Sequence, residues 1–180
     1  MSSISVVRKS ITDLEIQAIV NAANSGLWRG GGVCGAVFAA AGIELLTEAC
    51  EAIGGCETGS AVITSGFNSK ADFIIHAVGP VWRGGNHNEE RDLYSAYKKS
   101  LELAKKNGIQ HIAFPLISTG IFSYPVDKAW DVAIHACNDF INSNQDYDIE
   151  IIFAVLSAGL VKMGNEAIKN IEGLKNEDNT

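Results

Sequence analysis

Two glycine-rich loops follow predicted strands and lead into predicted helices, and their composition is typical of anion binding. The first is segment 21–35, NAANSGLWRGGGVCG, which runs into the small-residue sequence AVFAAAG. The second is segment 115–125, PLISTGIFSYP. Free backbone N–H groups at a helix start can surround an anion, and the helix dipole favours negative charge there. Two such loops in one small domain predict a clamp on a phosphate or pyrophosphate.

Amide side chains at the end of the preceding strand add hydrogen-bonding capacity to the first loop. Asn21 and Asn24 flank Ala22 and Ala23. A carboxamide offers both a donor and an acceptor to a ligand hydroxyl group. Two plainer interpretations stay open: Asn24 caps its own loop, and the glycines serve only turn formation.

Gly30, Gly32 and Gly35 match the pattern G-x-G-x-x-G, but their context differs from that of a dinucleotide-binding turn. Eight residues separate the predicted strand end from Gly30, where that fold requires a tight turn. Segment 45–55 is predicted to be helical, not a second strand that ends in a ribose-binding acid. No Gly-Lys-Ser/Thr sequence follows, which excludes a P-loop. A nicotinamide dehydrogenase is therefore a distant third hypothesis.

The elements that position these loops alternate between strands and helices, which predicts a three-layer α/β domain with a largely parallel sheet. Apolar runs predict the strands, and amphipathic stripes predict helices around Leu93–Ala104, from Val126 to about Ile141 and from about Lys162 to Ile171. Ligands bind at the carboxyl ends of such strands. The predicted strands are 4–7, 18–22, 61–65, 73–78, 111–116 and 150–156. His76 lies inside one of them, where a hydrogen-bonded core histidine is favoured over a catalyst.

Length and composition narrow the class of protein. The 180 residues are 47% hydrophobic and 19% charged, which fits one folded domain, predicted over 1–172 with a flexible tail over 173–180. The net charge of −7 argues against bulk nucleic-acid binding, which needs many Lys and Arg contacts to phosphate. The four cysteines form no C-x-x-C pair, and no apolar run is long enough to span a bilayer. We expect a cytoplasmic protein with free thiols, no metal, no cofactor and no membrane partner.

The motifs together resemble the macrodomain, the ADP-ribose-binding Macro or Appr-1''-p processing family, and its MacroD-type branch in particular. That family reads Gly-Asp-Ile-Thr, Ala-Ile-Val-Asn-Ala-Ala-Asn, a glycine-rich loop with Val-Asp-Gly-Ala, Ile-His-x-Val-Gly-Pro-x-Trp, and Ser-Thr-Gly-Ile-Tyr/Phe-Gly-Tyr-Pro. Order and spacing hold over roughly residues 4–170. The matching segments here are 11–12, 18–24, 30–36, 75–82 and 118–125. The resemblance implies a three-layer α/β/α fold with a mixed, mostly parallel sheet.

The resemblance also implies roles for individual residues in binding ADP-ribose. Asn24 would bond the distal ribose and orient the reacting centre. The glycine-rich loop would line the pyrophosphate and distal ribose through Gly31, Gly32 and Val33. The second loop would close the other side through Ser118, Thr119, Gly120 and Ile121, with Phe122 on the distal ribose. Ile11 would lie against the adenine.

Three positions depart from the family pattern. Ser10 stands where the family has the acid that accepts from the adenine amino group, and a neutral acceptor bonds more weakly than a charged one. Leu156 stands where the family often has an aromatic over the adenine. Cys34 replaces the acid thought to help activate water, and a thiol is a poor substitute for a carboxylate base. An inert, buried Cys34 is the equally weighted interpretation.

The resemblance therefore predicts a hydrolase that acts on ADP-ribose linked through its distal ribose, either on mono-ADP-ribosylated side chains or in O-acetyl-ADP-ribose. Asn24 and Cys34 are the candidate catalytic residues, and the partner is ADP-ribose or an ADP-ribosylated protein. The alternative is a reader module that binds ADP-ribose without turning it over. Cys34 favours this alternative.

Overall fold

The computed structural model describes residues 1–178, and its elements follow the predicted alternation. The strands are β1 (Ser3–Arg8), β2 (Ala18–Ala23), β3 (Ala61–Ser65), β4 (Phe73–Val78), β5 (His111–Phe114) and β6 (Glu150–Val155), and the helices are α1 (Gly32–Ala41), α2 (Ile43–Ile53), α3 (Glu89–Lys106), α4 (Val126–Ser143) and α5 (Ala158–Asp178). A short 3-10 turn, Ile11–Asp13, follows β1.

The six strands form one mixed sheet in the order β1-β6-β5-β2-β4-β3. Every neighbouring pair is parallel except β3 and β4, which are antiparallel. The prediction of a mixed, mostly parallel sheet is confirmed.

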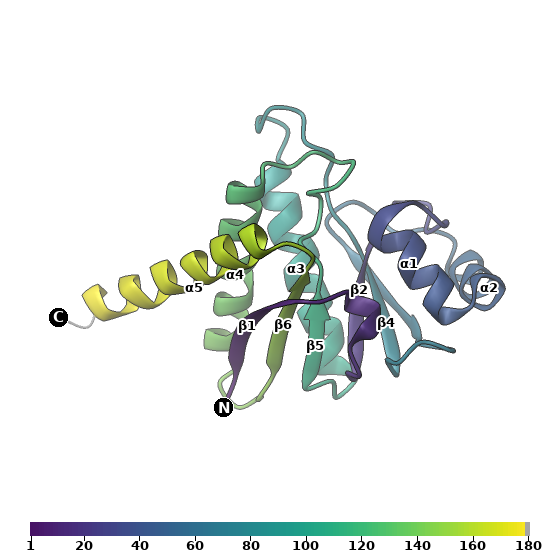
Figure 1. Ribbon diagram of the computed structural model, residues 1–180, viewed down its shortest axis with the longest axis horizontal. Helices are drawn as coiled ribbons and strands as arrows, with labels where there is room; N and C mark the ends of the chain where they lie inside the picture. Colours follow the sequence, from purple (N-terminus) through teal and green to yellow (C-terminus); the bar gives the residue numbers. More distant parts are fainter. Residues whose placement is uncertain (179–180) are drawn as a thin grey trace.

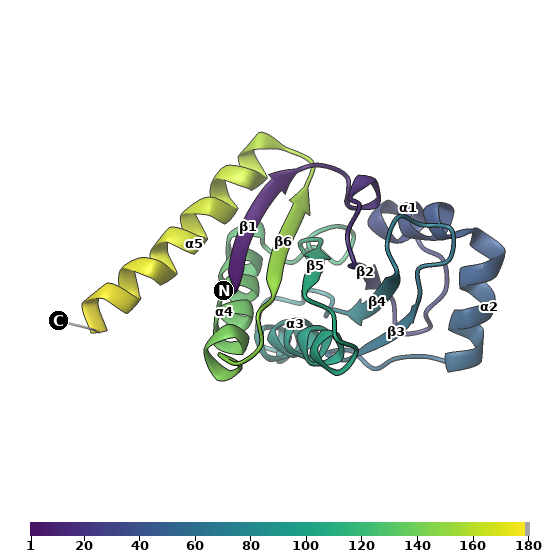
Figure 2. The ribbon, with the colours of Figure 1, turned by 90° about the horizontal axis from the view of Figure 1, so that it is seen from below.

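Helices cover both faces of the sheet, which gives three layers (Figures 1 and 2). On one face α1 and α2 pack with Ile19 of β2 and Ile74 of β4. On the other face α3, α4 and α5 pack with Val20 and Ile75 of the same strands. Successive residues of a strand point to opposite faces, so a strand covered on both sides is apolar except where its polar side chains are paired, as Asn21 and His76 are. This explains the continuous apolar runs in the sequence.

The bounds of strand β5 and helix α5 differ from the prediction for local reasons. Strand β5 ends at Phe114 and not at 116, because Pro115 has no N–H to donate to a neighbouring strand. Helix α5 begins at Ala158, where Ser157 Oγ accepts from Leu160 N–H at 3.2 Å, and it continues to Asp178, past the predicted end near Ile171. The flexibility of 173–180 stays a prediction, and residues 179–180 lie outside the described part.

None of the helices in the described part is, taken singly, both long and apolar enough to cross a membrane. The pair α1 and α2 passes that test of length and composition only when joined across its 109° bend.

Candidate functional site

The sheet opens between β2 and β5 at its carboxyl edge. β2 pairs with β4 along all of Ala18–Ala23, but with β5 only at Ala18 and Ile19. The chain then leaves β2 toward α1 on one face, while β5 leads to α4 on the other. Neighbouring parallel strands whose helices go to opposite faces create a crevice beyond their carboxyl ends. Both glycine-rich loops start from this point.

The first loop leads to a helix start that is free to receive an anion. Gly31 caps α1 without a side-chain hydrogen bond, and the first turn of α1 contains no acidic residue. Gly32 has φ +57°, and a Cβ built on it meets no atom within 4 Å, so its backbone faces open space. A Cβ on Gly35 would lie 2.9 Å from the Gly30 carbonyl oxygen, which makes glycine necessary there. The unoccupied N–H groups and the helix dipole favour a negatively charged ligand.

The second loop carries a buried hydroxyl group in an unusual backbone position. Ser118 has φ +69° and is 6% exposed, and its Oγ has no hydrogen-bond partner among residues 1–178. The Tyr124 N–H donates to the Ser118 carbonyl oxygen at 2.9 Å and closes the turn. A Cβ on Gly79 would lie 2.2 Å from Ser118 Oγ, so the end of β4 reaches this loop although β2 lies between the strands. A buried polar oxygen of this kind is normally satisfied by a ligand or solvent.

The loop after β4 braces the second loop. The Trp82 N–H donates to the Phe122 carbonyl oxygen at 2.8 Å. The loop itself is held by the buried Glu89 carboxylate, which accepts from the backbone N–H groups of Arg83, Gly85 and His87. Burial alone would raise the pKa of Glu89, but these donors lower it to about 2. The carboxylate therefore stays ionised and keeps the loop fixed at neutral pH.

A buried polar chain runs behind the first loop. Asn21 Nδ2 donates to His76 Nδ1 at 3.1 Å, so Nε2 carries the proton and donates to Thr64 Oγ1 at 3.0 Å. Thr64 in turn donates to the Ser65 carbonyl oxygen at 3.0 Å. Burial lowers the pKa of His76 to about 4. The prediction of a hydrogen-bonded core histidine is confirmed.

This buried histidine makes stability depend on pH. The unfolded chain protonates His76 near its ordinary pKa of 6.5, whereas the folded protein resists protonation down to about 4. The unfolded state thus binds more protons in this window, and stability falls as the pH drops through it. We expect a loss of about 3 kcal/mol between about pH 7 and about pH 4 from this residue. Denaturant unfolding should show a much flatter pH dependence for His76→Gln, and an unchanged one for the exposed His135→Gln. Equal slopes in all three proteins would contradict it.

The two candidate catalytic residues both contact the backbone of Trp28. Asn24 Oδ1 accepts from the Trp28 N–H at 3.1 Å, and its Nδ2 donates to the Trp28 carbonyl oxygen at 2.9 Å. The interpretation that Asn24 caps its own loop is therefore confirmed. Cys34 is 6% exposed, and its thiol lies 3.8 Å from the same carbonyl oxygen and 3.7 Å from Asn21 Nδ2. Cys34 sits at the third position of α1, beside the anion-facing N–H groups.

The other predicted site residues gather at the same edge, because β1, β6, β5 and β2 are parallel neighbours. Ser10 Oγ bonds Thr12 Oγ1 at 3.1 Å, and Ile11 is buried beneath, in one core cluster with Cys34. Leu156 at the end of β6 and Ile121 in the second loop are exposed. Thr119 donates its hydroxyl proton to the Leu116 carbonyl oxygen at 2.8 Å, and Gly120 accepts from the Ser123 N–H. The structure groups these residues, while their roles stay predictions.

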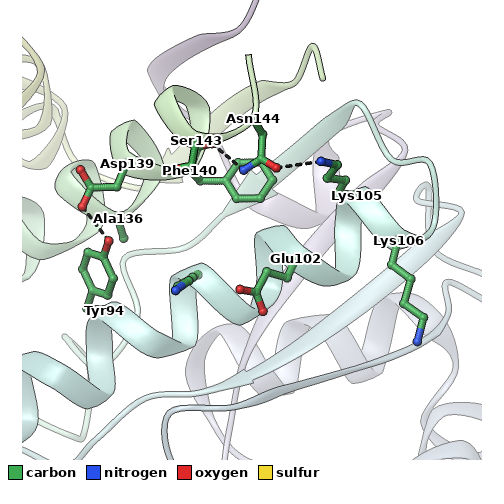
Figure 3. A pocket seen from close by; sticks show the side chains of 10 residues that line it. Tyr94, Glu102, Lys105, Lys106, Ala136, Asp139, Phe140, Ser143 and Asn144 are labelled. Atoms are coloured by element: carbon green, nitrogen blue, oxygen red, sulfur yellow. Dashed lines mark hydrogen bonds between the residues drawn. The ribbon is translucent and has the colours of Figure 1, made fainter. Parts of the chain in front are cut away.

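Two hollows lie away from this edge. A hollow of about 610 Å³ lies between α3 and α4 and includes Tyr94, Lys105, Asp139 and Asn144 (Figure 3). In it Tyr94 donates to Asp139 at 2.6 Å and Lys105 to Asn144 at 2.8 Å. The other, of about 490 Å³, lies at the opposite edge of the sheet. Within residues 1–178 no group of three or more His, Cys, Asp or Glu side chains is arranged to hold a metal ion.

Sequence reasoning missed three contributions to the site. Glu89 lies outside the predicted helix stripe and was not singled out, yet it fixes the loop that supports Phe122. The pairing of Asn21 with His76 across neighbouring strands has no local signal, although β2 and β4 are in register at these residues. Trp28 was not predicted as a site residue, although the sequence shows a tryptophan between a predicted strand and a glycine run. The structure shows that it is exposed.

Comparison with known proteins agrees with this architecture. The model of the Macro domain family matches residues 20–133. An Escherichia fergusonii protein named O-acetyl-ADP-ribose deacetylase is 51% identical over 144 residues, covering 78% of this chain and 81% of the relative. A Xenopus laevis protein named ADP-ribose glycohydrolase MACROD2 is 48% identical over 153 residues, covering 84% of this chain and 36% of the relative.

Comparison with solved structures also identifies macrodomains. The Oceanobacillus iheyensis macrodomain with ADP superposes with a TM-score of 0.90 at 35% identity, covering 96% of this chain and 93% of that one. The overall fold is thus shared with a solved macrodomain, and the family model matches the sequence. This chain belongs to the Macro domain family.

Proposed function

We propose that the protein binds ADP-ribose in the crevice at the carboxyl edge of the sheet. The observation that carries this proposal is the α1 helix start, which has open glycine backbone and no acidic residue in its first turn. The unpaired hydroxyl of Ser118 supplies a further donor for an anionic ligand. Support also comes from relatives named for ADP-ribose chemistry and from a neighbour whose structure contains ADP.

The reaction we propose is hydrolysis of the bond between the distal ribose of ADP-ribose and an acyl group. Water would add to the acyl carbon, the ribose oxygen would leave with a proton, and ADP-ribose and a carboxylic acid would result. The acyl group is acetyl in O-acetyl-ADP-ribose and an acidic side chain in a mono-ADP-ribosylated protein. Asn24 would orient the ribose, and either Cys34 or a water held by the ligand's own phosphate would assist. We place this activity in the cytoplasm.

A non-catalytic reader is the second candidate, and one observation favours it. The position beside the proposed reacting centre holds the buried thiol of Cys34 and no carboxylate. Loss of a general base commonly slows a reaction by about 100- to 10,000-fold. A slow enzyme thus differs from a reader only in releasing ADP-ribose faster than the linkage breaks in buffer alone.

Single-turnover kinetics test the proposal. With enzyme in excess, we expect the wild-type protein to release ADP-ribose from O-acetyl-ADP-ribose and from a protein modified on acidic side chains, faster than buffer alone. Calorimetry with ADP-ribose serves as the control for an intact site. Binding without release would establish the reader. Absence of both would overturn the proposal.

A further inference from the structure

Trp28 is an exposed side chain that the fold holds rigidly. Its residue is 67% exposed, yet both its N–H and its carbonyl oxygen are bonded to the Asn24 amide. A Cβ on Gly26 would lie 1.9 Å from the Trp28 ring, so the indole rests directly on that glycine. The preceding Leu27 is 3% exposed and is held at φ +59°. A leucine rarely adopts such a φ, and strain of this kind persists only where surrounding contacts enforce it.

The location of Trp28 links it to the reacting centre. Its backbone is bonded by Asn24 and lies 3.8 Å from the Cys34 thiol, the two candidate catalytic residues. The indole itself points away from the core, because two thirds of the residue is exposed. It can therefore contact only atoms outside the buried part of the crevice. A rigid, exposed aromatic side chain provides a large contact energy to a partner and loses little conformational freedom when the partner binds.

The neighbouring residue adds a positive charge. Arg29 is exposed, and no ion pair or hydrogen bond of its side chain occurs among the residues that the structure describes. It is the only charged residue between Ile16 and Ile43, in a chain whose net charge is −7. The segment 28–29, which we call the Trp28–Arg29 tip, is thus a local cationic and aromatic point on an acidic protein. Such a point attracts acidic segments of a partner and repels basic ones.

We propose that the Trp28–Arg29 tip binds an acidic polypeptide segment next to the side chain that carries the ADP-ribose. This inference rests on the proposed function and narrows it to protein-linked substrates. An acetyl group is too small to reach an indole that stands outside the crevice. A polypeptide continues past the modified side chain and can pack on the ring while its carboxylates pair with Arg29. The tip would thereby select the modified polypeptide. Binding of the ADP-ribose group itself would not depend on the tip.

Binding measurements with three probes test the tip independently of turnover. The probes are ADP-ribose, an ADP-ribosyl peptide with acidic flanks joined through a non-hydrolysable linkage, and the same peptide with those acids replaced by amides. We expect the wild-type protein to bind the acidic probe about tenfold more tightly than ADP-ribose. Trp28→Ala and Arg29→Gln should each remove most of that advantage and change the affinity for ADP-ribose less than about twofold. The contribution of Arg29 should shrink with added salt.

Matched variants separate the tip from general surface effects. Ile53→Ala removes an exposed apolar side chain from α2, and Lys169→Gln makes the same charge neutralisation on α5. Both variants should bind all three probes like the wild type. Equal affinity of the wild-type protein for ADP-ribose and the acidic probe would overturn the inference and leave the proposed function intact. So would equal affinity for the acidic and amide probes. Failure to bind ADP-ribose at all would instead overturn the proposed function, and this inference with it.

Discussion

Gly32→Val is expected to abolish ADP-ribose binding while the protein stays folded. The backbone of Gly32 faces open space at the start of α1, where the proposed pyrophosphate would lie against free N–H groups. A valine side chain would fill that space and hold the anion away from its donors. Because contacts to the charged pyrophosphate supply much of the affinity, we expect a loss of at least about 100-fold, or about 2.7 kcal/mol. Titration calorimetry with ADP-ribose measures it.

Gly108→Val is the matched control for that substitution. Gly108 has φ +69° against +57° for Gly32, and a Cβ on either meets no atom within 4 Å. It lies between α3 and β5, at the opposite edge of the sheet. Both variants suffer the same strain, roughly 1–2 kcal/mol for a side chain at such a φ, and their melting temperatures should fall by similar amounts. Normal binding by Gly32→Val would show that the pyrophosphate does not lie at α1.

The strands and helices could be predicted because the spacing of apolar residues in the sequence reflects which faces are buried. The central strands are covered on both faces, so runs such as Phe73–Val78 are apolar except for His76 and stand out. The stripe of Leu93, Tyr97 and Leu101 marks the buried side of α3. Once the strands are parallel, the loops that follow them must meet at one edge. The placement of both glycine-rich loops follows from these facts without any knowledge of contacts.

The finer geometry of the site could not be predicted, because tertiary contacts determine it. The left-handed φ of Leu27 and Ser118 opposes local preference and depends on burial of both residues. The two hydrogen bonds that tie Asn24 to Trp28 compete with the ribose contact expected for the same amide. Sequence spacing allowed either role, and the structure shows the closed turn between the two residues. Occupation of the site by a ribose would require Asn24 to share or exchange these partners.

The surroundings of the Cys34 thiol suit an acidic side chain. The side chain lies in the first turn of α1, where the helix dipole stabilises a negative charge. Asn21 Nδ2 lies 3.7 Å from the thiol and can donate to a carboxylate in the same place. The Trp28 carbonyl oxygen at 3.8 Å would oppose it weakly. The site thus retains the surroundings of an acid although it holds a cysteine.

Cys34→Asp is accordingly expected to accelerate single-turnover release of ADP-ribose by at least about 100-fold over the wild-type rate, because it would place a carboxylate base where we propose that the distal ribose binds. Cys34→Asn is the matched control, since it has the same shape without the charge, and it should gain nothing. Calorimetry should show ADP-ribose affinities within about threefold for all three proteins. If Cys34→Asp is no faster than Cys34→Asn while both still bind, the base must come from elsewhere, and the ligand's own phosphate becomes the group that activates water. If only Cys34→Asp releases ADP-ribose, the wild-type protein is the reader, with a pocket that one substitution converts into an enzyme.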